Sequence, residues 1–169
     1  MDSRFRGNDK NSMKTVIQRV KKASVKIENE VVGEINKGLL ILLAVHQDDA
    51  EKDIEWMVKK VLQLRIFSDD NDPSFAKATE GKGKMNLSVQ DIKGEILVVS
   101  QFTLYGDCKK GNRPSFEKSA EPVKAKEFYE KFVDALRDTD VNIQTGKFQE
   151  QMEIELINDG PVTIIIDSK

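Results

Sequence analysis

Two short segments of the chain combine residue types that could carry out chemistry. The first, Ser100-Gln101-Phe102-Thr103, directly follows an apolar stretch that predicts a strand, and functional groups are often held where a rigid element passes into a loop. Its hydroxyl and amide groups could bind a polar substrate, and its backbone N–H groups could stabilise an oxyanion. An ordinary strand end has the same local pattern, so spacing alone leaves both interpretations open.

The second segment, Asn158-Asp159-Gly160-Pro161, lies between two apolar stretches. Turns favour these four residue types, so a plain turn is the interpretation that the local sequence supports. A sharper interpretation rests on the Gly-Pro bond, because an X-Pro peptide held in the cis form points its carbonyl groups in an unusual direction. The glycine would also let the backbone approach a ligand closely.

Several common catalytic patterns are absent from the sequence. It has no His-Glu-x-x-His or Cys-x-x-Cys pattern and no glycine-rich phosphate loop, so we expect no metal site and no cofactor. His46 is the only imidazole that could activate a nucleophile, and a structural or surface role suits it better. Cys108, beside Lys109 and Lys110, is interpreted as an incidental thiol. Acid–base hydrolysis by an Asp or Glu stays open as an alternative.

The composition is that of a soluble globular protein. Of the 169 residues, 38% are hydrophobic and 33% are charged, which suits one domain with one core. The longest apolar run, Leu39–Val45, is too short to cross a bilayer, and residues 1–12 lack the apolar core of a signal peptide. A single cysteine cannot form an internal disulfide, which fits a reducing compartment. We therefore expect a cytoplasmic protein with no membrane partner.

The net charge of −2 argues against a chain that binds nucleic acid through general basicity. Any RNA contact must use a local patch. The sequence offers two candidates, one made by Lys109, Lys110 and Arg113 and the other by Lys21 and Lys22. Each patch taken alone is better interpreted as solvated surface.

The hydrophobic periodicity predicts strands, a helix, strands, a second helix and further strands. Strand patterns cover Val16–Val20, Ala23–Ile27, Val31–Ile35, Leu39–Val45, Glu95–Ser100, Val141–Gln144, Met152–Ile157 and Pro161–Ile166. One helix is expected to be capped by Asp48 or Asp49 and to end near Ile66. The other is expected to start at Glu121-Pro122. This order predicts one α/β domain whose sheet is partly covered by two helices.

Two stretches fall outside this pattern. Residues 1–12 are polar and irregular, so we expect a disordered extension and a folded domain over residues 13–169. Residues 68–84 carry turn-forming residues and a Gly-Lys-Gly-Lys sequence, so we expect a surface loop with an insertion at about residues 71–82. Within that loop, Phe75–Glu80 could form a helical turn.

Both chemical segments, in this order and at this distance, resemble the two signature motifs of the D-aminoacyl-tRNA deacylase family, also called D-tyrosyl-tRNA deacylases. The resemblance runs from Met13 essentially to the C-terminus. Further blocks that match in register are Ile17–Val20, Ala23–Val25, Gly38–Leu40, Arg65–Ser68, Gly83–Leu87, Val98–Leu104, Arg113–Phe116 and Asn142–Gly146. Residues 1–12 and the stretch around Asn71–Lys82 are extra relative to the family, and neither lies within a signature motif.

The resemblance implies a fold, an activity and an assembly. The fold would have a layered, barrel-like sheet core covered by two helices, and the activity would be hydrolysis of the ester of D-aminoacyl-tRNA and of glycyl-tRNA. The family acts as a homodimer with cross-subunit active sites, in which the Gly160-Pro161 segment of one subunit would enter the partner's pocket beside Ser100-Gln101-Phe102-Thr103. Arg19 would help to hold that segment, and Met152 would line the adenosine pocket.

The resemblance also frames the mechanism. Backbone carbonyls of Gly160 and Pro161 would occupy the space that an L side chain needs, so the wrong enantiomer would be excluded by repulsion. We favour activation of water by the 2′-hydroxyl of the terminal ribose, with Thr103 as a covalent nucleophile being the competing mechanism. A non-catalytic RNA-binding module on the same fold, or a general esterase that uses Thr103, are the alternatives to a proofreading enzyme.

Overall fold

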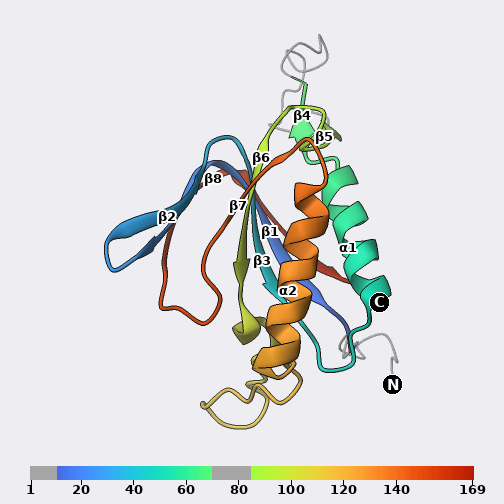
Figure 1. Cartoon of the computed structure of the whole chain (residues 1–169), viewed down its shortest axis with the longest axis vertical. Helices are drawn as coiled ribbons and strands as arrows, with labels where there is room; N and C mark the ends of the chain where they lie inside the picture. Colours follow the sequence, from blue (N-terminus) through green and yellow to red (C-terminus); the bar gives the residue numbers. More distant parts are fainter. Residues whose placement is uncertain (1–10, 70–84) are drawn as a thin grey trace, which may run out of the picture.

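The computed structural model describes residues 11–69 and 85–169, and Figure 1 shows how the elements are arranged. In chain order they are β1 (Lys14–Ile27), β2 (Glu30–Ile35), β3 (Gly38–Ala44), α1 (Glu51–Gln63), β4 (Phe67–Ser68), β5 (Met85–Leu87), β6 (Glu95–Ser100), the 3₁₀ helix η3 (Phe102–Tyr105), α2 (Pro122–Arg137), β7 (Asn142–Thr145) and β8 (Glu153–Asp167).

Six strands form one mixed sheet in the order β2-β1-β3-β6-β7, with β8 also paired along β1. β1 is antiparallel to β2, β3 and β8, whereas β6 is parallel to both β3 and β7. Parallel neighbours need a crossover connection, and the two crossovers carry α1 and α2, which lie side by side against the sheet (Figure 1). The predicted α/β class, with a layered, barrel-like sheet and two helices, is confirmed.

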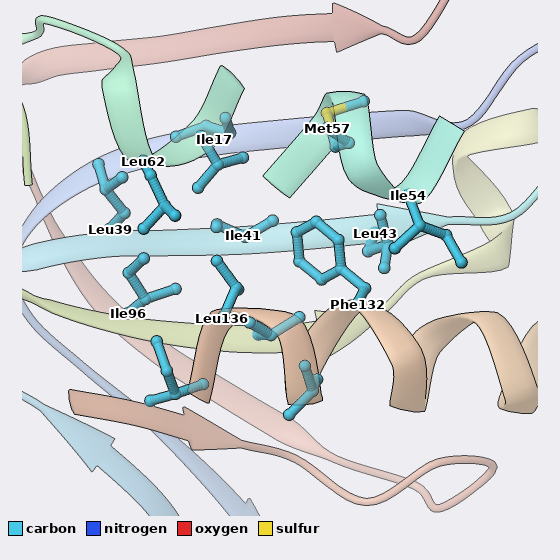
Figure 2. Close-up of a cluster of buried hydrophobic side chains, with 14 of the residues drawn as sticks. Ile17, Leu39, Ile41, Leu43, Ile54, Met57, Leu62, Ile96, Phe132 and Leu136 are labelled. Carbon is cyan, nitrogen blue, oxygen red and sulfur yellow. The ribbon is translucent and has the colours of Figure 1, made fainter. Parts of the chain in front are cut away.

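The central strands are buried on both faces, as their continuous apolar sequences predict. Along β3, Leu39, Ile41 and Leu43 face the helices, where they meet Met57 of α1 and Phe132 of α2 (Figure 2). The alternate residues of β3 and β6 form a second cluster with β1 and β2 on the opposite face. Each fully buried side chain of this kind contributes roughly 1.5–3 kcal/mol, so the sheet is held from both sides.

Strand β1 is a single strand, and the prediction of two strands in its place is wrong. The buried positions alternate from Met13 to Ile17 and then fall three residues apart, at Val20 and Ala23, with the exposed Lys21 and Lys22 between them. The register against β8 shifts in this region. A β-bulge lets a strand continue while its inward face changes phase, which the local pattern presents as two strands.

Strand β8 is also continuous, so the plain turn predicted at Asn158-Asp159-Gly160-Pro161 is wrong. Gln18 of β1 pairs with Thr163, and Val20 pairs with Asn158. The four residues 159–162 therefore bulge out opposite the single residue Arg19. The Asn158 side chain bridges the bulge, because its Oδ1 accepts the Val162 N–H at 2.7 Å and its Nδ2 donates to the Val162 carbonyl at 3.2 Å.

The expected N-terminal cap of α1 is also wrong. The helix starts at Glu51, and the N–H of Ala50 donates to the carboxylate of Asp53 at 2.9 Å. Asp49 turns away from the helix and accepts the N–H of His46 at 2.7 Å. A carboxylate in the first turn of a helix can accept a hydrogen bond from a free backbone N–H just as a carboxylate before the helix can.

The far boundaries of the elements differ by smaller amounts. Helix α1 ends at Gln63, before the expected end near Ile66, because Leu64 is already extended at φ −62° and ψ 120°. Helix α2 begins at Pro122, as predicted.

Ser12 is fully buried, so the packed chain begins before Met13. Residues 1–10 and the expected insertion at 71–82 lie outside the described residues. No helix of the described ranges is long and apolar enough to span a membrane.

Candidate active site

The parallel strands β3 and β6 end side by side, and this edge carries the first chemical segment. Leu43 pairs with Ser100, and the N–H of Gln101 extends the ladder by donating to the Leu43 carbonyl at 2.8 Å. The chain then leaves the sheet and turns into η3. Ligands of open α/β sheets bind outside the carboxyl ends of the parallel strands, so this edge is the expected place for a site.

The η3 turn presents two backbone donors to solvent. The N–H of Leu104 donates to the Gln101 carbonyl at 3.3 Å, but the N–H groups of Phe102 and Thr103 come first in the turn and have no partner within it. Both residues are exposed, and neither backbone N–H finds an acceptor within residues 11–69 and 85–169. Two adjacent donors held by a helical turn are the arrangement that an oxyanion requires.

The Thr103 hydroxyl has a partner but lacks a base. The side-chain amide of Gln101 donates to Oγ1 of Thr103. His46, the only imidazole, is fully buried and does not line the neighbouring cavity. A hydroxyl nucleophile needs a general base to remove its proton, and the amide of Gln101 is not a base.

A cavity of about 630 Å³ opens beside η3. Its size is in the usual range for a small-molecule site. Its lining is mostly apolar and comprises Ala44, Val45, Val99, Ser100, Gln101, Phe102, Phe116, Ser119, Ala120, Pro122, Ala125, Phe148, Gln149, Glu150, Met152 and Ile154. It therefore joins Ser100, Gln101 and Phe102 of the first segment with Met152, for which the family resemblance implies a place at the adenosine pocket.

Aromatic contacts build one wall of the cavity. The ring of Phe102 meets that of Phe116 edge-on, with centroids 5.1 Å apart and an interplanar angle of 72°. Phe102 keeps 53% of its surface exposed. No sequence pattern indicated a role for Phe116 or Phe148, although both lie in or next to blocks that resemble the family. Only the arrangement of the loops shows that they face the same space.

A buried polar cluster fixes η3 from behind. The Tyr105 hydroxyl donates to the Ser12 carbonyl at 2.5 Å and lies 3.2 Å from the Ala44 carbonyl. The His46 ring packs edge-on against Tyr105 at 5.5 Å. Burial lowers the pKa of His46, and its Nδ1 accepts the Asp48 N–H at 3.0 Å. His46 is thus a structural residue, the role the sequence favoured, and it stabilises the segment that carries the candidate donors.

Asp49 makes the stability of this cluster depend on pH. Burial raises the pKa of its carboxyl from 3.8 to about 6, so between these values the folded chain holds a proton that the unfolded chain has lost. The free energy of unfolding therefore falls as the pH rises from about 4 to about 6. Asp49→Asn cannot ionise, so we expect its stability relative to wild type to rise across this window, by roughly 3 kcal/mol in total.

Denaturant titrations of the two proteins between pH 4 and pH 8 measure this difference directly. We expect the difference to stay constant above about pH 6, where the wild-type carboxyl is ionised in both states. A difference that does not change with pH would show that Asp49 ionises normally in the folded protein.

The second chemical segment is held by Arg19. Its Nε donates to the Asp159 carbonyl at 3.0 Å, and its Nη1 donates to the Ile66 carbonyl at 2.6 Å. The Gly160–Pro161 peptide is cis, and Gly160 has a φ of +132°. A Cβ at Gly160 would lie 3.0 Å from Nη2 of Arg19 and 2.9 Å from Cγ2 of Val162. Only glycine fits this backbone without strain.

The two segments do not meet within one protomer. Thr163, at the end of the bulge, pairs with Gln18 of β1, which pairs with Leu40 of β3, which in turn pairs with Leu97 of β6. Three strand spacings, about 14 Å, therefore separate the bulge from β6, and no residue of 158–163 lines the cavity. The structure thus brings together Ser100, Gln101, Phe102 and Met152 in one place, and Arg19 with Gly160 and Pro161 in another.

Within the described ranges, no group of three or more His, Cys, Asp or Glu could hold a metal ion.

Comparison with known proteins places this site in a family. The sequence model of the family described as D-Tyr-tRNA(Tyr) deacylase matches residues 16–167. A D-aminoacyl-tRNA deacylase of Thermosipho africanus is 51% identical over 93% of this chain and 98% of its own length. A second, from Thermotoga petrophila, is 52% identical over 92% of this chain and 97% of its own.

Two solved structures resemble the fold. The c-Myc DNA unwinding element binding protein is 39% identical, with a TM-score of 0.79 over 90% of this chain and 97% of that one. A probable eukaryotic D-amino acid tRNA deacylase has a TM-score of 0.76 over 92% and 99% of the two chains, and at 16% identity it supports the fold alone. From the family match over most of its length and from its curated relatives, this chain belongs to the D-Tyr-tRNA(Tyr) deacylase family.

Proposed function

We propose that this protein hydrolyses the ester that joins a D-amino acid to the 3′ end of tRNA. One observation carries the proposal: two adjacent, unpaired backbone donors on η3 stand at the rim of an apolar cavity, on a chain of this family. The cavity takes the terminal adenosine, with Phe102 and Met152 against the base. The ester carbonyl then reaches the N–H groups of Phe102 and Thr103.

Hydrolysis follows from this placement. Water adds to the ester carbonyl, and the oxyanion that forms accepts hydrogen bonds from the two η3 donors. The intermediate then expels the 3′-oxygen of the ribose, which takes up the proton that the water gives away. The 2′-hydroxyl next to it relays this proton. The one carboxylate that lines the cavity among the described residues, Glu150, forms no hydrogen bond with Thr103. An aminoacyl ester is reactive enough for so small a set of groups.

The same site excludes L-amino acids through the Gly160-Pro161 segment of a second subunit. Its carbonyls fill the space that an L side chain needs, whereas a D side chain or the hydrogen of glycine avoids it. The contacts of Arg19 with the Asp159 and Ile66 carbonyls support this role, since exclusion requires a rigid segment. Glycyl-tRNA is therefore a substrate too.

The homodimer has its own support. Within the described chain, β8 pairs with β1 along one edge and with no strand along the other. It carries two exposed isoleucines, Ile157 at 46% and Ile165 at 69%. A long, unprotected edge strand invites pairing with another chain. A two-fold dimer would give two equivalent sites, each built from the cavity of one subunit and the bulge of the other.

The test is hydrolysis of D-tyrosyl-tRNA, L-tyrosyl-tRNA and glycyl-tRNA by the purified protein. We expect the D and glycyl esters to be cleaved and kcat/KM for the L ester to be lower by at least about 1,000-fold, because the excluded side chain meets backbone that cannot move away. Equal cleavage of the D and L esters would contradict chiral exclusion. Binding of tRNA without cleavage of any ester would favour a non-catalytic RNA-binding module.

A further inference from the structure

We propose that the loop tip formed by residues 108–114 is a phosphate-binding arm that holds the acceptor end of the tRNA. The inference rests on the proposed function, in which the cavity takes the terminal adenosine. It concerns how the rest of the RNA is held. The sequence offers two basic patches, and the structure distinguishes between them by their distance from the cavity and by the charges around them.

The arm is a closed loop that projects from the site edge. Asp107 and Ser115 exchange two backbone hydrogen bonds, of 2.8 and 2.9 Å, which close its base. The Asp107 carboxylate, at the base of the loop, accepts the N–H of Lys109 at 2.9 Å, which holds the start of the loop in place. At the tip, Gly111 has a φ of +71° and open space around it. Figure 1 shows the loop between η3 and α2 extending beyond the sheet.

The charge of the arm has one sign. Its seven residues include Lys109, Lys110 and Arg113 and no acidic residue, and all seven are exposed. Lys110 and Arg113 form no ion pair with any other described residue. In a chain whose net charge is −2, such a concentration of cations gives a local positive field that attracts a phosphate backbone.

The base of the arm is part of the cavity wall. Phe116 follows Ser115 directly, lines the cavity and packs against Phe102 at 5.1 Å. The arm thus begins at the cavity wall, and we place near its tip the phosphates that precede a base bound in the cavity. The recognition is electrostatic and independent of base sequence, since lysine and arginine contact phosphates without reading base edges.

The other patch does not fit this role. Lys21 and Lys22 lie in the middle of β1, where Lys22 pairs with Ile157 of β8. Lys22 and Lys26 line a separate hollow of about 380 Å³ together with Glu34 and Glu155, and Lys26 forms an ion pair with Glu155 at 2.8 Å. The two carboxylates offset the charges of the two lysines, and the hollow shares no residue with the cavity beside η3.

The test compares Lys110→Ala/Arg113→Ala with a matched control, Lys37→Ala/Lys59→Ala, which also removes two exposed cations but lies away from the cavity. Each protein is assayed on D-tyrosyl-tRNA and on the D-tyrosyl ester of adenosine. For the arm variant we expect KM for the tRNA to rise about tenfold at low salt, with kcat unchanged. The slope of log KM against log salt concentration should decrease by roughly 1.5, the effect of two lost phosphate contacts. Cleavage of the adenosine ester should match wild type.

Two outcomes would contradict the phosphate-binding role of the arm. One is a KM and a salt slope for the tRNA that equal those of the control variant. The other is an equal loss of kcat/KM for D-tyrosyl-tRNA and for the adenosine ester, which would mean that the loop only supports the structure of the cavity. Binding of uncharged tRNA, measured across the same salt series, separates this inference from the proposed function. A wild-type protein that cleaves none of the esters refutes the proposed function. If the arm variant nevertheless binds tRNA more weakly and with less salt dependence than wild type, the phosphate-binding role of the arm is still supported.

Discussion

A D-tyrosyl-tRNA whose terminal ribose lacks the 2′-hydroxyl is expected to be cleaved roughly 100- to 10,000-fold more slowly than the natural substrate. This is the usual contribution of a positioned general acid–base group. Glu150 is the only ionisable side chain among the described residues that line the cavity, and it forms no hydrogen bond with η3, whereas His46 is fully buried and does not line the cavity. Single-turnover kinetics with the two substrates measure the chemical step directly.

The companion variant is Thr103→Ala, which removes the only hydroxyl that could form a covalent intermediate on η3. We expect it to keep kcat within about threefold of wild type, since the backbone N–H that we assign to the oxyanion remains. A Thr103→Ala protein without activity, together with normal cleavage of the 2′-deoxy substrate, would establish the covalent mechanism instead. Loss of activity in both experiments would require a role for each group.

Gly160→Ala is expected to lower kcat/KM for D-tyrosyl-tRNA by about 100-fold. The added Cβ would approach Arg19 Nη2 to 3.0 Å at a φ of +132°, so the bulge must shift. A displacement of about 1 Å in a positioning segment has an effect of this size. The free energy of unfolding should fall by only about 1–3 kcal/mol, the usual range for one strained residue. Steady-state kinetics and denaturant titration on the same samples give the two numbers.

The control is Gly94→Ala, in the turn before β6. Its Cβ would meet three atoms at 3.1 Å, so it should lose stability while kcat/KM stays near wild type. A Gly94→Ala protein that loses activity as strongly would mean that lost stability, and not the position of the bulge, explains the Gly160 variant.

Gly160→Ala also tests whether the site is shared between subunits. Phe102→Ala damages the cavity side, because it removes the ring that we place against the base, and Gly160→Ala damages the bulge side. In randomly mixed dimers of the two, half of the molecules are hybrids, and each hybrid has one site with both sides intact. We expect activity to recover to about one quarter of wild type. If each site is formed by one subunit, mixing will restore nothing.

The sequence by itself determined the class of fold and the segments that matter. The apolar runs of β3 and β6, the proline at the start of α2 and the helical spacing before Ile66 are local signals, because burial and backbone geometry follow from a few neighbouring residues. The signature segments were found in the same way, since their residue types stand together in the chain. They identified the family without any knowledge of how the chain folds.

Only the tertiary structure decided how these parts are placed. The pairing of β1 with β8 continues past the bulge because the Asn158 side chain, in place of a neighbouring strand, forms hydrogen bonds with the backbone of Val162. The walls formed by Phe116 and Phe148 come from loops far apart in sequence, and the separation of the Gly160 bulge from the cavity follows from strand register. Such contacts arise when hydrogen bonding and packing are satisfied across the whole sheet at once, so no local pattern contains them.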